Sequence, residues 1–255
     1  MILTLDLGNT NLYLGVYQDE KLIATYRTYS DKRKSSDGYG VILQTFLSKE
    51  KLNPSLFKGA ILSSVIPSLN RTIVLAVEKI LHISCMQVSP KIKSGIPLRI
   101  DNPSELGADL VSDAVGAIKK YGTSLLIVDM GTATKFLVVN KDGAFEGCII
   151  TPGIKTSFRA LIEDTAQLME IEFETPRNLI GKNSKDSLNS GAIYGTCAQI
   201  IELRRMIEDN LGYKLIPILT GGNAILVKNH LEDFIYDDHL ILDGLLTIYK
   251  KNKRV

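Results

Sequence analysis

Apolar runs separated by short polar turns open the chain. Residues 2–7, 12–18 and 21–30 are rich in Leu, Tyr and Thr, and turns at Gly8-Asn9 and Asp19-Glu20 separate them. β-Branched and aromatic residues favour extended strands, and breaks this short join antiparallel neighbours. This stretch therefore predicts a three-stranded antiparallel meander.

Apolar positions three or four residues apart then indicate helices. We expect Asp37 to cap a helix that ends near Lys49, with its apolar side chains on one face. A buried strand is expected over 59–66, and Pro67 then opens a second helix. A Pro- and Asn-rich loop follows, and it is expected to become helical near Glu105.

The opening pattern restarts after residues 121–122. Three strands are again expected, over 124–131, 134–140 and 144–153. The remaining expected elements are helices over 153–169, 184–209 and 223–232, a strand over 213–220 and a last helix over 237–251. Two halves of this kind predict an α/β protein with an internal duplication, which we divide into 1–118 and 119–255.

One short motif occurs at matching points of the two halves. Asp6 and Asp129 each end a strand and are followed by a glycine and small hydroxyl or amide residues. Such a turn directs amide groups and the hydroxyls of Thr10, Thr132 and Thr134 into one concavity, which suits phosphate oxygens. The aspartates could hold Mg²⁺ or a monovalent cation. One copy alone is an ordinary hairpin turn, but two copies facing each other across a cleft could clamp a polyphosphate.

A third glycine turn follows the strand expected over 213–220. Gly221 and Gly222 come directly after it, and Asn223 could cap the next helix. Close approach of a glycine backbone to a flat nucleoside, beside a helix N-terminus, is a reasonable use for this junction. Junctions of this kind are common in α/β proteins, so it supports the phosphate hypothesis only weakly.

Composition narrows the class of protein. Hydrophobic residues make up 45% and charged residues 23% of the chain, as in globular domains. No apolar run reaches the roughly 18–20 residues that cross a bilayer, and Asp6 interrupts the first run, which argues against a signal peptide. The net charge of +2 gives no argument for nucleic acid, and 3 scattered histidines give none for zinc. Three cysteines without paired spacing predict buried free thiols and a cytoplasmic protein.

Six segments carry a resemblance to a known family. They are DLGNTN (6–11), NPSELGAD (102–109), VDMGTAT (128–134), GCIITPGI (147–154), IGKNSKDSLNSGAIYG (180–195) and LTGG (219–222). In this order and spacing, over nearly the whole length, they resemble the type III pantothenate kinases, within the acetate and sugar kinase, hexokinase and actin superfamily. The resemblance implies duplicated ribonuclease-H-like (actin/hexokinase-type) halves, each a mixed sheet that starts with an antiparallel meander and is flanked by helices. It also implies ATP-dependent phosphorylation of pantothenate to 4′-phosphopantothenate, the first step of coenzyme A biosynthesis, by a homodimer.

The resemblance assigns roles to individual residues. Asp109 would be the general base, although an aspartate at a helix start more usually serves as a cap. Asp6 would lie on the Mg²⁺ side, and Asp129 near a potassium or ammonium ion. The ATP contacts would be Asp6, Leu7, Gly8, Asn9, Thr10, Asn11, Leu12, Tyr13 and Thr132, with Gly221 and Gly222 on the adenosine side. The pantothenate contacts would be Ile100, Gly107, Ala108, Asp109, Leu110 and Ser184.

Three positions near the expected acceptor pocket depart from the family pattern. Leu110 stands where the family has an arginine that grips the acceptor carboxylate, Ile100 replaces an aromatic residue, and Lys135 replaces a threonine. Losing an arginine–carboxylate contact would cost about 1.5–3 kcal/mol of binding free energy. Either Arg99 or Lys135 partly replaces the arginine, or both project into solvent.

These departures leave three functions open. The first is a pantothenate kinase, the second a related kinase for another small alcohol, and the third a nucleotide-binding paralogue with a regulatory role. Asp6, Asp109 and Asp129 are all present, which argues against the third, because a protein that only binds nucleotide has little need for a base.

Overall fold

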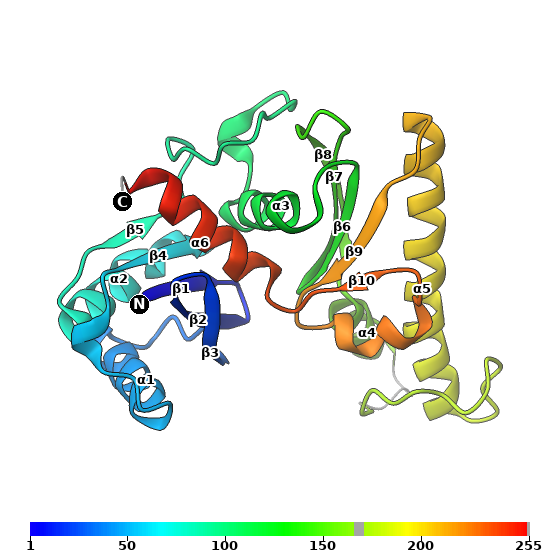
Figure 1. Cartoon of the computed structure of the whole chain (residues 1–255). Coiled ribbons are helices and arrows are strands. Elements are labelled where there is room, and N and C mark those ends of the chain that lie inside the picture. The colour runs from blue at the N-terminus through cyan, green and yellow to red at the C-terminus, as the bar shows by residue number, and fades with distance from the viewer. Residues whose placement is uncertain (166–170, 254–255) are drawn as a thin grey trace. The chain divides into compact units, whose positions relative to one another are not determined.

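The structure is a computed structural model and describes residues 1–165 and 171–253. The chain forms two compact units, and each contains a five-stranded mixed sheet (Figure 1). The first unit consists of Met1–Ile96, Asp101–Lys120 and Leu240–Val255, and the second of Pro97–Ile100 and Tyr121–His239. The halves 1–118 and 119–255 mark where the sequence pattern restarts, whereas the compact units are defined by contacts within the fold. The division into these halves therefore stays a prediction.

The sheet of the first unit has the strand order β3-β2-β1-β4-β5. Its strands are β1 (Ile2–Leu7), β2 (Asn11–Gln18), β3 (Lys21–Tyr29), β4 (Gly59–Ser64) and β5 (Cys85–Gln87). The predicted meander is confirmed, since β2 pairs antiparallel with both β1 and β3. On the other side of β1, β4 pairs parallel with β1 and β5 pairs parallel with β4. Parallel neighbours need a crossover connection, and helices supply it here.

Four α-helices accompany this sheet. They are α1 (Ser36–Lys49), α2 (Pro67–Leu81), α3 (Ala108–Tyr121) and α6 (Leu240–Asn252), with short 3-10 helices at Pro54–Leu56 and Pro103–Glu105. Two expectations were wrong in detail. Ser35 caps α1 by accepting the Gly38 amide, and Asp37 lies inside the first turn. The helix expected near Glu105 begins at Ala108, because the proline-led 3-10 turn precedes it.

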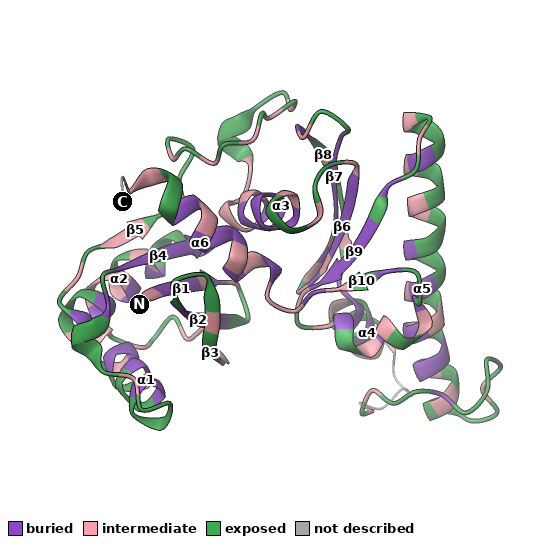
Figure 2. Cartoon of the chain, viewed as in Figure 1, coloured by how far each residue is buried: buried purple, intermediate pink, exposed green. Residues whose placement is uncertain are grey.

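Both faces of the first sheet are covered, which explains the nearly continuous apolar runs of β1 and β4. Buried side chains of α1 and α2, such as Phe46 and Ile73, join Leu3 and Leu5 on one face. The other cluster joins Ile61 of β4 to side chains of α3 and α6. α3 and α6 meet through glycines: a methyl carbon added at Gly244 would lie 1.8 Å from the Ser112 carbonyl oxygen. Figure 2 shows the buried positions following the central strands.

The second unit repeats this topology. Its sheet has the order β10-β9-β6-β7-β8, with antiparallel pairing through β6, β7 and β8 and parallel pairing of β6, β9 and β10. The strands are β6 (Leu125–Met130), β7 (Ala133–Val139), β8 (Phe145–Pro152), β9 (Ile216–Thr220) and β10 (Ile235–Tyr236), and the helices are α4 (Ile154–Glu163) and α5 (Ser184–Leu211). The matching strand orders confirm duplicated ribonuclease-H-like halves.

Several expectations for the second unit need correction. The helix expected over 223–232 is absent, and two 3-10 turns, Ala224–Leu226 and Lys228–His230, take its place. α4 ends at Glu163, and residues 166–169 of the expected helix lie outside the described residues. Cys148 is exposed although a buried thiol was expected. Within the described residues, no helix has the length and apolar character to cross a membrane.

Candidate functional site

The first aspartate turn is held in place by the end of β3. The Gly8 amide donates to the Asn11 carbonyl oxygen at 2.9 Å, which closes the turn. The Ser30 hydroxyl donates to the Gly8 carbonyl oxygen at 2.7 Å, and the Ser30 amide donates to the Thr10 carbonyl oxygen at 2.9 Å. The turn therefore has a fixed backbone before any ligand binds. Ser30 was not identified as a site residue from the sequence. Its place at the end of the third expected strand could have indicated that it lies beside the first turn.

Side chains of the first turn divide into exposed and buried ones. Asn9, Thr10 and Asn11 are exposed, and Asp6 is half-buried at the end of β1. Leu7, Leu12 and Tyr13 are in contrast buried and belong to the packed core. Contacts of these three with a ligand would have to be made by their backbone atoms.

The second aspartate turn is fixed by the start of α4. The Thr132 carbonyl oxygen accepts the Gly153 amide at 3.0 Å and the Thr156 hydroxyl at 2.8 Å. The Thr132 side chain is exposed, as expected for a residue that contacts phosphate. Thr134 was expected to point into the same concavity, and this was wrong. Only 1% of Thr134 is exposed, because its position in β7 alternates onto the buried face of the sheet.

The third glycine turn lies directly against the second aspartate turn. Gly221 has a φ of +90°, and a methyl carbon added there would lie 2.4 Å from Asp129 Oδ1 and 2.6 Å from the Met130 amide nitrogen. The Asn223 amide donates to the Met130 carbonyl oxygen at 2.9 Å, and Asn223 Nδ2 donates to the Gly131 carbonyl oxygen at 2.8 Å. Asn223 thus joins two turns and makes no side-chain cap, which corrects the expectation for it.

Asp129 is paired with a lysine of the neighbouring strand. Lys135 Nζ lies 2.5 Å from Asp129 Oδ2, and the two side chains are only 15% and 13% exposed. The antiparallel register of β6 and β7 places the two residues directly opposite each other. Lys135 therefore does not project into solvent. The sequence placed Lys135 beside the turn but did not pair it with Asp129. Counting residues outward from the turn along both strands would have predicted that the two are opposite each other.

The two expected metal ions fit this site differently. Among the residues the structure describes, no three His, Cys, Asp or Glu side chains gather as a metal cluster. Mg²⁺ commonly takes one or two carboxylates and completes its coordination with phosphates and water, so Asp6 fits that ion. A monovalent cation at Asp129 does not fit, because an ammonium already faces that carboxylate.

The expected general base stands at the start of α3. Upstream, Asn102 organises the chain by accepting the Ser104 amide at 3.2 Å and donating to Glu105 Oε1 at 2.6 Å. Asp109 Oδ1 accepts the Leu110 amide at 2.9 Å, and a methyl carbon added at Gly107 would lie 2.4 Å from that oxygen. This bond reaches only the amide of the next residue, whereas a capping side chain accepts the amide two or three residues on, so it is not a cap bond. Nothing here tests the role of Asp109 as a base, which stays a prediction.

The expected acceptor contacts are distributed over both units. Gly107, Ala108, Asp109 and Leu110 belong to the first unit, and Ile100 and Ser184 to the second. Leu110 is only 7% exposed, so its side chain is part of the packed interior. Ser184 is exposed at the first position of α5, where Asn183 caps the helix.

Arg99, the other cation considered for the acceptor, is already paired. Its guanidinium lies 3.0 Å from Asp142 and 3.8 Å from Glu146, while its side chain stays 54% exposed. Pairs this exposed contribute little to stability, so Arg99 could still exchange partners.

Comparisons with known proteins agree on one family. A family model described as type III pantothenate kinase matches residues 2–206. A type III pantothenate kinase of Agathobacter rectalis is 36% identical over 100% of this chain and 98% of its own length. One from an Exiguobacterium species is 35% identical over the full length of both chains.

A solved structure with a similar fold comes from another kind of kinase. A candidate 2-dehydro-3-deoxygalactonokinase from Sinorhizobium meliloti matches 100% of this chain and 98% of its own with a TM-score of 0.64. The two sequences are only 13% identical, so this similarity bears on the fold alone.

Proposed function

The chain belongs to the type III pantothenate kinase family, and we propose that it transfers the γ-phosphoryl group of ATP to the primary alcohol of pantothenate. The products are 4′-phosphopantothenate and ADP, and the reaction is the first step of coenzyme A biosynthesis. The full-length relationship to pantothenate kinases carries this proposal, and the two aspartate turns of the duplicated sheets supply residues suited to it.

The first turn is proposed to bind the ATP phosphates. Its exposed residues Asn9, Thr10 and Asn11 supply amide and hydroxyl donors, and the bonds from Ser30 hold that backbone ready. Asp6 would hold Mg²⁺ together with phosphate oxygens and water. When bound, Mg²⁺ neutralises charge on the phosphates. Thr132 would touch ATP with its exposed hydroxyl, and Gly221 and Gly222 would lie on the adenosine side.

Asp109 is proposed to act as the general base. The pantothenate hydroxyl oxygen attacks the γ-phosphorus, and the bond from that phosphorus to the bridging oxygen of ADP breaks, with its electron pair leaving on ADP. The hydroxyl proton passes to the Asp109 carboxylate. A base of this kind contributes about 10²–10⁴-fold, while positioning and charge stabilisation supply most of the acceleration.

A second candidate function is a kinase for another small alcohol. The observation that favours it is the buried leucine at position 110, where the family has an arginine for the acceptor carboxylate. Arg99 already has two carboxylate partners, and Lys135 faces Asp129, so neither is an uncommitted replacement. An acceptor without a carboxylate would lose nothing by this change.

An ADP-release assay separates these functions. The full chain is incubated with ATP, Mg²⁺ and either pantothenate or other small alcohols, in parallel buffers that contain potassium or choline as the monovalent cation. ADP release and 4′-phosphopantothenate formation with pantothenate are expected. Turnover only with an uncharged alcohol would instead favour the second candidate, and nucleotide binding without turnover on any alcohol would favour a regulatory paralogue.

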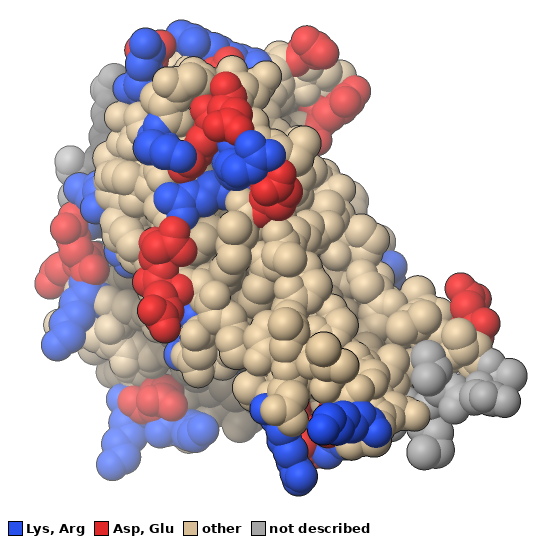
Figure 3. Space-filling view, turned by 90° about the vertical axis from the view of Figure 1, so that its right-hand side faces the viewer, with Lys and Arg blue, Asp and Glu red and all other residues tan. Residues whose placement is uncertain are grey.

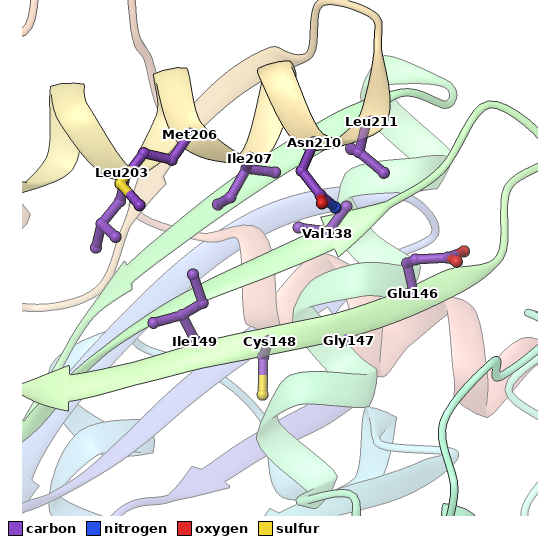
Figure 4. Close-up of a pocket in the computed structure, with 10 residues that line it drawn as sticks. All are labelled: Val138, Glu146, Gly147, Cys148, Ile149, Leu203, Met206, Ile207, Asn210 and Leu211. Atoms are coloured by element: carbon purple, nitrogen blue, oxygen red, sulfur yellow. The ribbon is translucent and has the colours of Figure 1, made fainter.

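We also propose a homodimer, formed through an apolar face of the second unit. A groove of about 300 Å³ lies between β8 and α5 and is lined mainly by apolar side chains, among them Ile149, Leu203 and Met206 (Figure 4). Met206 and Ile201 on α5 are 53% and 52% exposed. The face that α5 presents is largely uncharged along its middle, and charged side chains of both signs lie towards its two ends (Figure 3). Exposed apolar surface of this kind commonly marks a protein interface.

A cytoplasmic location is proposed as well. ATP is the phosphoryl donor of the proposed reaction, and Cys85 and Cys197 are free thiols, as is usual in a reducing compartment.

A further inference from the structure

We propose that the Lys135 ammonium replaces a bound monovalent cation at Asp129, so that this protein works without potassium or ammonium ions. The claim that the protein works without these ions rests on the proposed kinase function. The claim that no such ion binds at Asp129, which we call the ion-binding half of the inference, can be tested on the protein alone. The two residues that carry it, Asp129 and Lys135, both lie in the second unit.

The geometry of the pair is that of a fixed internal counter-ion. Nζ of Lys135 approaches Oδ2 of Asp129 to 2.5 Å, so the two charged groups form a charge-assisted hydrogen bond, which is stronger than one between neutral groups. Directly opposed residues of an antiparallel pair have their side chains on the same face, so the strand register itself brings the charges together. With 15% and 13% of their side chains exposed, the charges are screened by salt much less than a surface pair.

The remaining surroundings of Asp129 leave little room for a second cation. Its other oxygen, Oδ1, lies against the Gly221 backbone, where even an added methyl carbon would come within 2.4 Å. Asn223 ties the same glycine turn to Met130 and Gly131, so the turn cannot easily withdraw. A potassium ion that reached Asp129 would have to displace the ammonium or lie beside it, and like charges at such a distance repel strongly.

A fixed ammonium at this place also has a use in the proposed reaction. Asp129 begins the turn that contains Thr132, the proposed ATP contact, and a bare carboxylate there would repel the nucleotide's phosphates. Lys135 neutralises that carboxylate permanently. The charge that another protein of this kind would recruit from solution is here supplied by the chain.

Thermal melting of the full chain tests the ion-binding half directly. The melting temperature is measured in potassium chloride, ammonium chloride and choline chloride at equal ionic strength, with and without ADP and Mg²⁺. A cation that binds only the folded protein raises the melting temperature as its concentration increases. We expect the same melting temperature in all three salts, and a saturable rise specific to potassium or ammonium would overturn the proposal.

The variant Lys135→Thr tests the opposite situation, because threonine is the usual family residue and the substitution removes the internal cation. This variant is expected to gain a potassium-dependent rise in melting temperature of about 2–4 °C. Its ADP release in choline should fall at least about tenfold below that in potassium, whereas the unaltered chain changes by less than about twofold. Lys141→Thr, at an exposed turn of the same unit, is the control and should behave like the unaltered chain.

The outcomes separate this inference from the proposed function. Potassium-dependent turnover by the unaltered chain, or salt-independent turnover by Lys135→Thr at the original rate, would contradict the inference while leaving the kinase assignment intact. Absence of ADP release in every salt would contradict the kinase assignment, and the melting experiment would still decide whether Asp129 binds a cation. Should Lys135→Thr not fold, the melting temperatures of the unaltered chain in the three salts remain decisive.

Discussion

At the scale of single residues, Gly221 shows how tightly the second unit is assembled around Asp129. Its φ of +90° is accessible to glycine at no cost, and its missing side chain leaves room for Asp129 Oδ1 and the Met130 backbone. Every other residue type would require both a strained backbone and a shift of its neighbours. The position therefore couples the glycine turn to the aspartate turn by contact.

Gly221→Ala should accordingly lower the free energy of unfolding by about 1–3 kcal/mol and weaken ATP binding. Denaturant unfolding and nucleotide titration measure the two effects. Gly195→Ala is the control, because Gly195 lies in α5 with nothing within 4 Å of an added methyl carbon. That change should leave stability unaltered or raise it by up to about 1 kcal/mol. Equal stabilities of the two variants would argue against the packing described here.

Sequence reasoning identified the aspartates of the site but not their surroundings. Asp6, Asp129 and the following glycines stand out because an acid and a glycine end an apolar run twice. The pairing of Lys135 with Asp129 depends on the hairpin register, which can be counted back from the turn but is not part of the motif itself. The bonds of Asn223 depend on tertiary contact, which no linear motif shows. Thr134 was assigned to the ligand side because its hydroxyl suggested it, whereas strand alternation places it on the buried face.

At the scale of elements, the strands were predictable because alternation and turn residues are local signals. The helix expected over 223–232 failed for a non-local reason: the Gly221-Gly222 junction is bound to Met130 and Gly131 through Asn223, which favours short 3-10 turns there. The cap of α1 shows a smaller error of the same kind. Ser35 and Asp37 are both good caps by residue type, and only the backbone decides between them.

The connection from α5 to β9 depends on one buried carboxylate. Glu208 is only 5% exposed and accepts hydrogen bonds from Arg204 at 3.0 Å, Lys214 at 2.7 Å and the Leu215 amide at 3.2 Å. Burial alone would raise the pKa of Glu208, but these donors outweigh it and hold the pKa below its usual range. The ionised carboxylate therefore stabilises the folded state.

Glu208→Gln should lower the free energy of unfolding by about 1–3 kcal/mol at neutral pH. Because the pKa is lower in the folded state than in the unfolded one, this contribution is complete above the usual glutamate pKa and is lost as the pH falls through the folded value. Denaturant unfolding of both proteins across the acid range checks this. A difference that stayed constant down to the lowest pH, or grew, would contradict the role given to the charge.

At the scale of the whole molecule, the duplicated topology accounts for most of what the sequence predicted correctly. In each unit an antiparallel meander is followed by parallel strands, and an aspartate is the next-to-last residue of the meander's first strand. The compact units nevertheless cross the sequence repeat, since Leu240–Val255 belongs to the first unit. The contact of α6 with α3 through Gly116 and Gly244 depends on backbone approach, which no periodicity reveals.

The homodimer proposal predicts the effect of a charge on the apolar face. Met206→Asp places a carboxylate beside the groove of β8 and α5, where burial against a second copy would be unfavourable. Sedimentation analysis should show a dimer for the unaltered chain and a shift towards monomer for the variant. Val41→Asp, at a 61% exposed position of α1, is the control and should remain dimeric. A monomeric unaltered chain would remove the proposal.

The most direct test of the account is the turnover of Asp109→Asn with ATP, Mg²⁺ and pantothenate. We expect turnover to fall about 10²–10⁴-fold while Mg²⁺-ATP affinity and melting temperature stay close to those of the unaltered chain. Asp19→Asn, at an exposed turn whose backbone asparagine tolerates, is the matched control and should keep full activity. Turnover by Asp109→Asn within about twofold of the unaltered chain would contradict the assignment of Asp109 as the base. A folded, ATP-binding parent chain that forms no 4′-phosphopantothenate would contradict phosphorylation of pantothenate.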